Sequence, residues 1–296
     1  MKRIMMLLLC MAALIVPAQA QHFQQVTGFT GSMLQVAAGR SEVWGINTSG
    51  NVFRLVGSKF VSVSGALSKI AVGGGTAFQK DDIWGLDESG NIFRFDYGTK
   101  SFTQIPPTLA GSLEQIAVGV GYNDGCHPYE VWGINFKANA FRYNYCNHVF
   151  ESLPINLFFF QVSTAAGAIW GLNTDSHLLV WNFNTLQFQD TGQSGFASIA
   201  ADGNDVWVLT GGTFDIFAVG AFNGSYGASR INGTLVQLAA GDAGVWGIDA
   251  NLKIYRFDPA VGSFVIVPGS LAQIAVGSGA GVWGVTNTGQ VFTFVP

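Results

Sequence analysis

Charged residues are scarce in this chain of 296 residues, where Asp, Glu, Lys and Arg make up 11% and hydrophobic residues 49%. Disordered chains show the opposite balance, so this composition indicates a folded protein. Helical periodicity is missing after the first twenty residues, and no later run of eighteen apolar residues could cross a membrane as a helix. The sequence therefore predicts an all-β protein without membrane insertion.

The first twenty residues differ from the rest of the chain. Lys2 and Arg3 precede an apolar stretch over 4–16 that is too short to span a bilayer, and a small-residue cleavage site follows over 18–20. This pattern predicts a signal peptide over 1–20 and a mature chain that begins near Gln21. We expect a secreted or periplasmic protein in a compartment that permits disulfides.

Basic residues are also few. Without Lys2 and Arg3 the 14 basic residues become 12, against 18 acidic ones, so the mature chain carries a net charge of −6. A protein that binds nucleic acid or an anionic membrane through its overall field needs the opposite sign. We therefore expect neither nucleic acid nor an anionic membrane as a partner.

Two cysteines remain in the mature chain, Cys126 and Cys146. An even count in an exported protein predicts one disulfide. His127 and His148 lie beside them, so a Cys/His zinc site is the alternative. Structural zinc sites usually have closer C-x-x-C spacings and are mostly intracellular, which favours the disulfide, and we predict no metal site and no cofactor.

A tryptophan motif recurs seven times at intervals of 37 to 48 residues. Each copy contains an apolar run that ends in Gly, a Trp strand such as VWGIN, a Phe-Arg strand such as NVFRL, and a closing strand such as SFVIVPG. Four short strands separated by turn residues are typical of one blade of a β-propeller. The repeated residues are Trp44, Trp84, Trp132, Trp170, Trp207, Trp246 and Trp283.

The two ends of the chain predict how the ring closes. The last copy stops one strand short of a blade, and the mature N-terminus reads HFQQVTG, which resembles a closing strand. The N-terminal strand would then complete the last blade and remove the open edges. We therefore predict that 21–296 forms one closed propeller of seven four-stranded blades, with a six-bladed ring as the alternative.

The turn inside the motif predicts which side chains face each other. In the first copy, 48–50 suits a three-residue hairpin loop with Gly50 in the left-handed region. Counting outward places Trp44 opposite Arg54. The same spacing pairs an Arg with the Trp in copies two, three and six, where a guanidinium on an indole contributes about 0.5 to 1 kcal/mol when exposed.

The string VWGIN followed by GN-x-FR, after a strand such as LAQIAVG, resembles the tectonin repeat of β-propeller lectins and related egg lectins. The resemblance covers nearly the whole mature chain and is weakest in copies four and five. It implies a secreted, multivalent lectin that recognises cell-surface glycans, including methylated sugars or lipopolysaccharide. Members of the family more often have six blades.

Two repeated polar positions are candidates for glycan binding, together with one aromatic residue outside the repeat. An aromatic face and fixed polar groups are what a sugar site requires. The alternative is that acid and Arg neutralise each other and keep the strands in register, and that the seven repeated Trp are core residues. The candidates are Glu42, Asp82, Glu130, Asp205, Arg54, Arg94, Arg142, Arg256 and Trp181.

Two other classes of function compete with the lectin. An enzyme is disfavoured because the four histidines show no metal-binding or triad-like spacing, and the acids follow the repeat instead of forming a unique pair. A docking propeller that binds one macromolecule is the alternative, and the insert of copy three, GYNDGCHPYE, is its expected contact surface.

Overall fold

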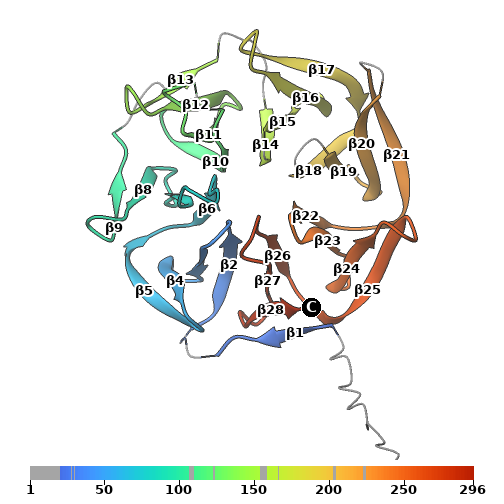
Figure 1. The fold of residues 1–296 in the computed structure, drawn as a ribbon, viewed down its shortest axis with the longest axis horizontal. Coiled ribbons are helices and arrows are strands. Elements are labelled where there is room, and N and C mark those ends of the chain that lie inside the picture. Colours follow the sequence, from blue (N-terminus) through green and yellow to red (C-terminus); the bar gives the residue numbers. More distant parts are fainter. Residues whose placement is uncertain are drawn as a thin grey trace, which may run out of the picture.

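A computed structural model describes residues 21–27, 29, 31–106, 110–122, 124–153, 159–165, 167–202, 205–222 and 225–296, without the side chains of 159–165, 202, 205 and 222. The predicted signal peptide lies outside the described residues. Within these ranges the regular elements are strands, and they form seven four-stranded sheets around a common centre (Figure 1). The prediction of an all-β propeller with seven blades is confirmed.

Blades one to four follow the chain, with the first strand of each blade innermost (Figure 1). Blade one contains β2 (Met33–Ala38), β3 (Val43–Asn47), β4 (Asn51–Val56) and β5 (Lys59–Ala66). Blade two contains β6 (Lys69–Gly73), β7 (Asp82–Leu86), β8 (Ile92–Asp96) and β9 (Ser101–Gln104). Blade three contains β10 (Leu113–Val120), β11 (Tyr129–Asn135), β12 (Ala140–Asn144) and β13 (Val149–Ser152). Blade four contains β14 (Phe159–Ala165), β15 (Ala168–Asn173), β16 (His177–Asn182) and β17 (Gln187–Ser194).

The remaining blades repeat this order and bring the two ends of the chain together. Blade five contains β18 (Phe196–Asp202), β19 (Asp205–Thr210), β20 (Asp215–Phe222) and β21 (Ser225–Thr234). Blade six contains β22 (Gln237–Gly241), β23 (Gly244–Ile248), β24 (Lys253–Asp258) and β25 (Ser263–Ser270). Blade seven contains β26 (Gln273–Val276), β27 (Val282–Val285), β28 (Val291–Val295) and β1 (His22–Gln25).

The ring closes as predicted, because β1 is the outer strand of blade seven. It pairs antiparallel with β28, from His22 opposite Val295 to Gln25 opposite Phe292. Backbone hydrogen bonds within blade seven thus fix the two ends of the chain to each other and satisfy the outer edge of β28.

The predicted hairpin register is also confirmed. Trp44 lies opposite Arg54, and the equivalent pairs are Trp84 with Arg94, Trp132 with Arg142, and Trp246 with Arg256. Gly50 has φ 78°, in the left-handed region that glycine tolerates. Leu252 takes the same conformation with φ 64° in blade six, so the turn keeps its shape without a glycine.

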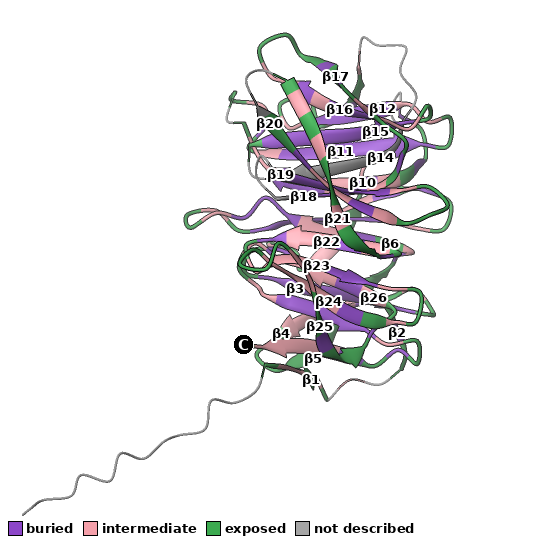
Figure 2. Ribbon diagram, turned by 90° about the vertical axis from the view of Figure 1, so that its right-hand side faces the viewer, coloured by how far each residue is buried: buried purple, intermediate pink, exposed green. Residues whose placement is uncertain are grey.

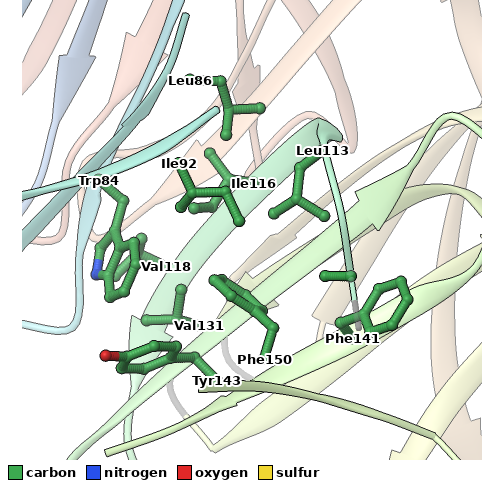
Figure 3. Packing of buried hydrophobic residues seen from close by; sticks show 11 residues of the cluster. Trp84, Leu86, Ile92, Leu113, Ile116, Val118, Val131, Phe141, Tyr143 and Phe150 are labelled. Atoms are coloured by element: carbon green, nitrogen blue, oxygen red, sulfur yellow. The ribbon is translucent and has the colours of Figure 1, made fainter. Parts of the chain in front are cut away.

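The repeated tryptophans lie between blades. The Trp84 indole is fully buried and packs edge-on against Tyr143 and Phe150 of blade three, with ring centroids 4.7 and 5.8 Å apart (Figure 3). Trp44 makes the same contacts with Phe95 of blade two. Seven hydrophobic clusters occupy the seven junctions, and each contains one repeated Trp.

The innermost strands surround a central channel lined mainly by small apolar residues such as Ala38, Val72 and Ala240. Neighbouring strands approach closely there: a Cβ added to Gly73 would lie 2.3 Å from the carbonyl oxygen of Val118. Gly73 therefore lets blades two and three approach each other closely. Figure 2 shows that buried residues are most frequent on the middle strands of the blades, such as β11 and β15, and that exposed residues lie on the loops and on outer strands such as β21.

Removing a single repeated Trp from between two blades should destabilise the whole ring. Trp84→Ala deletes a fully buried indole at the junction of blades two and three, and should lower the free energy of unfolding by about 3–5 kcal/mol. Urea denaturation followed by circular dichroism measures this loss. Phe78→Ala is the control, because the Phe78 side chain is fully exposed and its removal should cost no more than about 0.5 kcal/mol. Equal losses of unfolding free energy in the two variants would contradict the role of Trp84 in holding the two blades together.

Candidate functional site

The junction of blades one and two carries a polar network beside its Trp. The Glu42 carboxylate accepts hydrogen bonds from Trp44 Nε1 at 2.8 Å, from Arg54 at 2.7 Å and from the Tyr97 hydroxyl of blade two at 3.0 Å. Glu42 is 8% exposed, whereas the Arg54 side chain is 34% exposed. Lys80 lies 4.6 Å from the Tyr97 ring centroid. The buried Glu42 carboxylate thus fixes Arg54 and Tyr97, which form a partly exposed cationic and aromatic surface.

The junction of blades two and three repeats this arrangement. Asp82 accepts hydrogen bonds from Trp84 Nε1 at 2.7 Å, from Arg94 Nε at 2.9 Å and from the Tyr145 hydroxyl at 2.5 Å. The Asp82 side chain is 3% exposed and that of Arg94 is 32% exposed. The Arg94 guanidinium lies 4.9 Å from the Tyr145 ring centroid. We call the Arg–Tyr surfaces at these two junctions the polar clefts.

The third copy of the network is closed. Arg142 binds both carboxylate oxygens of Glu130, and a second acid, Asp124, approaches it at 3.7 Å. The aromatic partner from the next blade is Phe183, which has no hydroxyl and lies 5.8 Å from the guanidinium. Because the Arg142 side chain is only 9% exposed, this junction offers little of its cation to a ligand.

The other four copies lack this network in the described residues. In blade six Arg256 lies 5.5 Å from the Trp246 ring, but Trp246 Nε1 donates to the carbonyl of Ala243 and not to an acid. The buried Trp170 Nε1 has no partner among the described residues. The Asp205 side chain lies outside the described residues. The structure places Trp181 in the hydrophobic core, 4.9 Å from the Trp132 ring.

Two features of the polar clefts were not predicted. Tyr97 and Tyr145 each follow their own Arg by three residues but donate to the acid of the preceding blade. Asp81 is fully buried and accepts backbone hydrogen bonds from Arg40, Ser41 and Glu42, which fixes the loop that carries Glu42. An Arg-x-x-Tyr spacing was the available sequence signal for the tyrosines.

Burial and negative charge act together on the two tyrosines. Burial raises the pKa of Tyr145 far above its usual 10.0, and the nearby Asp82 carboxylate raises it further. Burial and Glu42 raise the pKa of Tyr97 in the same way. Burial lowers the pKa of Arg94, but the Asp82 carboxylate together with Tyr145 and Tyr143 outweighs this and leaves the pKa raised. Tyr97 and Tyr145 are therefore neutral phenols at neutral pH, and Arg94 carries its charge.

The insert of blade three lies beside the closed copy. Cys126 and Cys146 form a disulfide with Cα atoms 5.1 Å apart, so the predicted bridge is confirmed over the zinc alternative. His127 contacts the Asp124 carboxylate at 2.7 Å. The Tyr122 ring, 52% exposed, stacks on Phe183 at 4.2 Å. The bridge thus joins the insert to the turn between β12 and β13.

In the described part of the chain, no group of three or more His, Cys, Asp or Glu side chains is arranged to hold a metal ion. The same residues contain no helix of the length and apolarity that crossing a membrane would require.

The Tectonin domain family matches residues 32–125 and 112–293. The chain therefore belongs to the Tectonin domain family. Among curated proteins, no sequence matches it significantly.

Solved propellers share the fold at low sequence identity. Prp20p from Saccharomyces cerevisiae has a TM-score of 0.66 at 11% identity, over 88% of this chain and 82% of that one. YCF48 from Cyanidioschyzon merolae has a TM-score of 0.63 at 14% identity, over 93% of this chain and 99% of that one. The propeller domain of Swd1 from Myceliophteria thermophila has a TM-score of 0.69 at 10% identity, over 90% and 98%. These likenesses concern the fold alone.

The acid of a polar cleft should contribute more to stability than an exposed acid. Asp82→Ala leaves the Trp84 indole N–H, the Tyr145 hydroxyl and Arg94 without their acceptor, and should lower the free energy of unfolding by about 3 kcal/mol. Urea denaturation checks this. Glu114→Ala removes an exposed acid on β10 and is the control. A loss no larger than that of the control would show that the network does not stabilise the blade junction.

The raised pKa of Tyr145 predicts an alkaline loss of stability. The unfolded phenol ionises near pH 10 whereas the folded one does not, so its contribution is complete below pH 10 and falls as the pH rises above it. Urea midpoints at pH 9 and at about pH 11 should differ more for the wild type than for Tyr145→Phe. An identical pH dependence in both proteins would contradict this assignment.

Proposed function

We propose that the mature chain, from about Gln21, is a secreted or periplasmic multivalent lectin that binds glycans in its polar clefts, and that it is not an enzyme. Membership of the Tectonin domain family and the disulfide, which is typical of an oxidising compartment, support this proposal. The main supporting observation is that two arginines use only part of their hydrogen-bond donors. Among the described residues, Arg54 and Arg94 each make one hydrogen bond to their acid.

A guanidinium has five N–H donors in one plane. One bond to a buried carboxylate fixes the direction of Arg54 or Arg94 and leaves the other donors available where a third of the side chain reaches solvent. A tyrosine ring lies against each cation. Fixed donors beside an aromatic ring are the groups that a pyranose requires, since they match its hydroxyls and its apolar face. The acid thus acts as a support, and Arg and Tyr as the expected ligand contacts.

The two polar clefts lie at adjacent junctions of one rigid ring. Two weak sites on one body gain avidity through effective concentration when the ligand is displayed repeatedly, as on a cell surface. Methylated glycans and lipopolysaccharide are the ligand classes we expect. The closed Arg142 copy is expected to contribute stability instead of a third site, because two acids, Glu130 and Asp124, surround its buried guanidinium.

A protein-docking propeller is the second candidate, favoured by the insert of blade three. The disulfide holds this insert, and Tyr122 presents an exposed ring on it. The printed descriptions of two similar structures name partners: Prp20p with Gsp1p and histones, and YCF48 with a D1 peptide. A docking surface of this kind would bind one partner asymmetrically, whereas the polar clefts should bind the same sugar twice.

Purified residues 21–296 on a glycan array, followed by calorimetry on the best sugar, test the proposal. We expect two equivalents per chain, and one equivalent after Arg94→Ala, because one of two equal clefts is lost. Arg230→Ala is the matched control, since it removes an exposed Arg paired with Asp215 on the far side of the ring and should change nothing. Circular dichroism confirms that each variant is folded. The absence of any hit with a folded protein would instead favour the docking function.

A further inference from the structure

A cavity of about 520 Å³ opens between blades five and six, away from the polar clefts. It lies against the face of blade five that carries Trp207, Ala218 and Ser229, and Phe257 of blade six forms part of its wall. We call it the blade-five cavity. Its volume falls within the range of small-molecule sites, roughly 300–1,000 Å³.

The cavity exists because blade five departs from the repeat at the position opposite its Trp. Ala218 lies opposite Trp207, at the position that Arg54, Arg94 and Arg142 occupy in blades one to three. The short side chain leaves the space that a guanidinium fills elsewhere. Trp207 is 7% exposed, and its ring lies 4.6 Å from that of Phe257, so the inner end of the cavity is aromatic.

Two glycines extend this space along the sheet. Gly220 on β20 lies opposite Gly227 on β21, and both belong to the face of Ala218, because alternate residues of a strand share a face. Neither has a positive φ, and a Cβ added to either one would meet no atom of the described residues within 4 Å. Unlike Gly73, this pair is not required by a turn or by a neighbouring backbone. Unforced glycines within a strand weaken it, and they mark places where something else approaches the sheet.

The lining also indicates the chemistry of the occupant. Its described residues are uncharged, and Ser229 supplies its one side-chain hydroxyl. A charged ligand would find no partner for its charge among these described side chains. A flat ring fits against the Trp207 and Phe257 rings and over the bare strands at the glycine pair.

We propose that the blade-five cavity binds a neutral aromatic small molecule, with its ring between Trp207 and the Gly220–Gly227 pair. This proposal is independent of glycan binding in the polar clefts. The site is formed by the absence of side chains, so restoring a side chain should close it without disturbing the fold.

Indole is the probe, titrated into the 15N-labelled protein and followed by two-dimensional NMR. We expect shifts at the amides of Ala218 and Ser229. Gly220→Val should weaken indole binding at least about tenfold while the melting temperature stays equal or rises, because valine fills open space and favours the strand. Ser62→Val is the matched control, since it adds the same residue to an exposed outer strand in blade one and should leave binding unchanged.

Gly227→Ala gives a second test with the smallest possible change, should the valine variant fail to fold. It should also weaken indole binding, though less. Unchanged indole affinity in a folded Gly220→Val or Gly227→Ala protein would overturn the proposal, and so would the absence of any shift in blade five. Tighter binding of methyl glucoside than of indole at these amides would overturn it too. A failed glycan array would leave this result unaffected, because the two experiments report different junctions.

Discussion

The structure depends on one contact repeated seven times, the insertion of an indole between neighbouring blades. A blade is a four-stranded sheet with two apolar faces, and it becomes stable only when the next blade covers it. Each repeated Trp supplies a large rigid surface for this purpose, and the residues around it form the cluster of that junction. Ring closure by β1 then gives every blade two neighbours.

The polar residues near the Trp follow from the same constraint. Most buried indole N–H groups have an acceptor, and that of Trp170 is an exception among the described residues. In blades one to three the acceptor is an acid, and the buried acid in turn requires a cation. In blades six and seven the acceptor is a backbone carbonyl, so no acid is needed. Stability alone therefore explains why acid and Arg occur together. The surplus donors of Arg54 and Arg94 are what this structural role does not explain.

The sequence predicted the elements that are local in the chain and missed those that depend on the next blade. Trp44 opposite Arg54 follows from one hairpin count, and β1 follows from a missing strand and a matching terminus. The hydrogen bond from Tyr97 to Glu42 joins residues 55 positions apart on different sheets, so hairpin counting could not reveal it. The closed copy differs from the open ones partly through Asp124, which belongs to the irregular insert.

The same limit applies to blade five. The sequence shows that copy five of the repeat is weak and lacks the Arg. The resulting cavity, however, depends on how Phe257 of the next blade packs against Trp207. Sequence departures in a repeat protein can thus mark either degeneration or a distinct site. The unforced glycines at Gly220 and Gly227 separate these two interpretations, and only their three-dimensional surroundings identify them as unforced.

The repeated Arg residues stabilise the blade junctions, and we propose that they bind ligand only where some of their N–H donors are not used by an acid. NMR of the arginine Nε–H groups, during titration with the best glycan from the array, tests this most directly. The account predicts that the signals of Arg54 and Arg94 move while that of Arg142 stays in place. Movement of Arg142 without the other two, or no movement at any of them while the glycan binds, would contradict it.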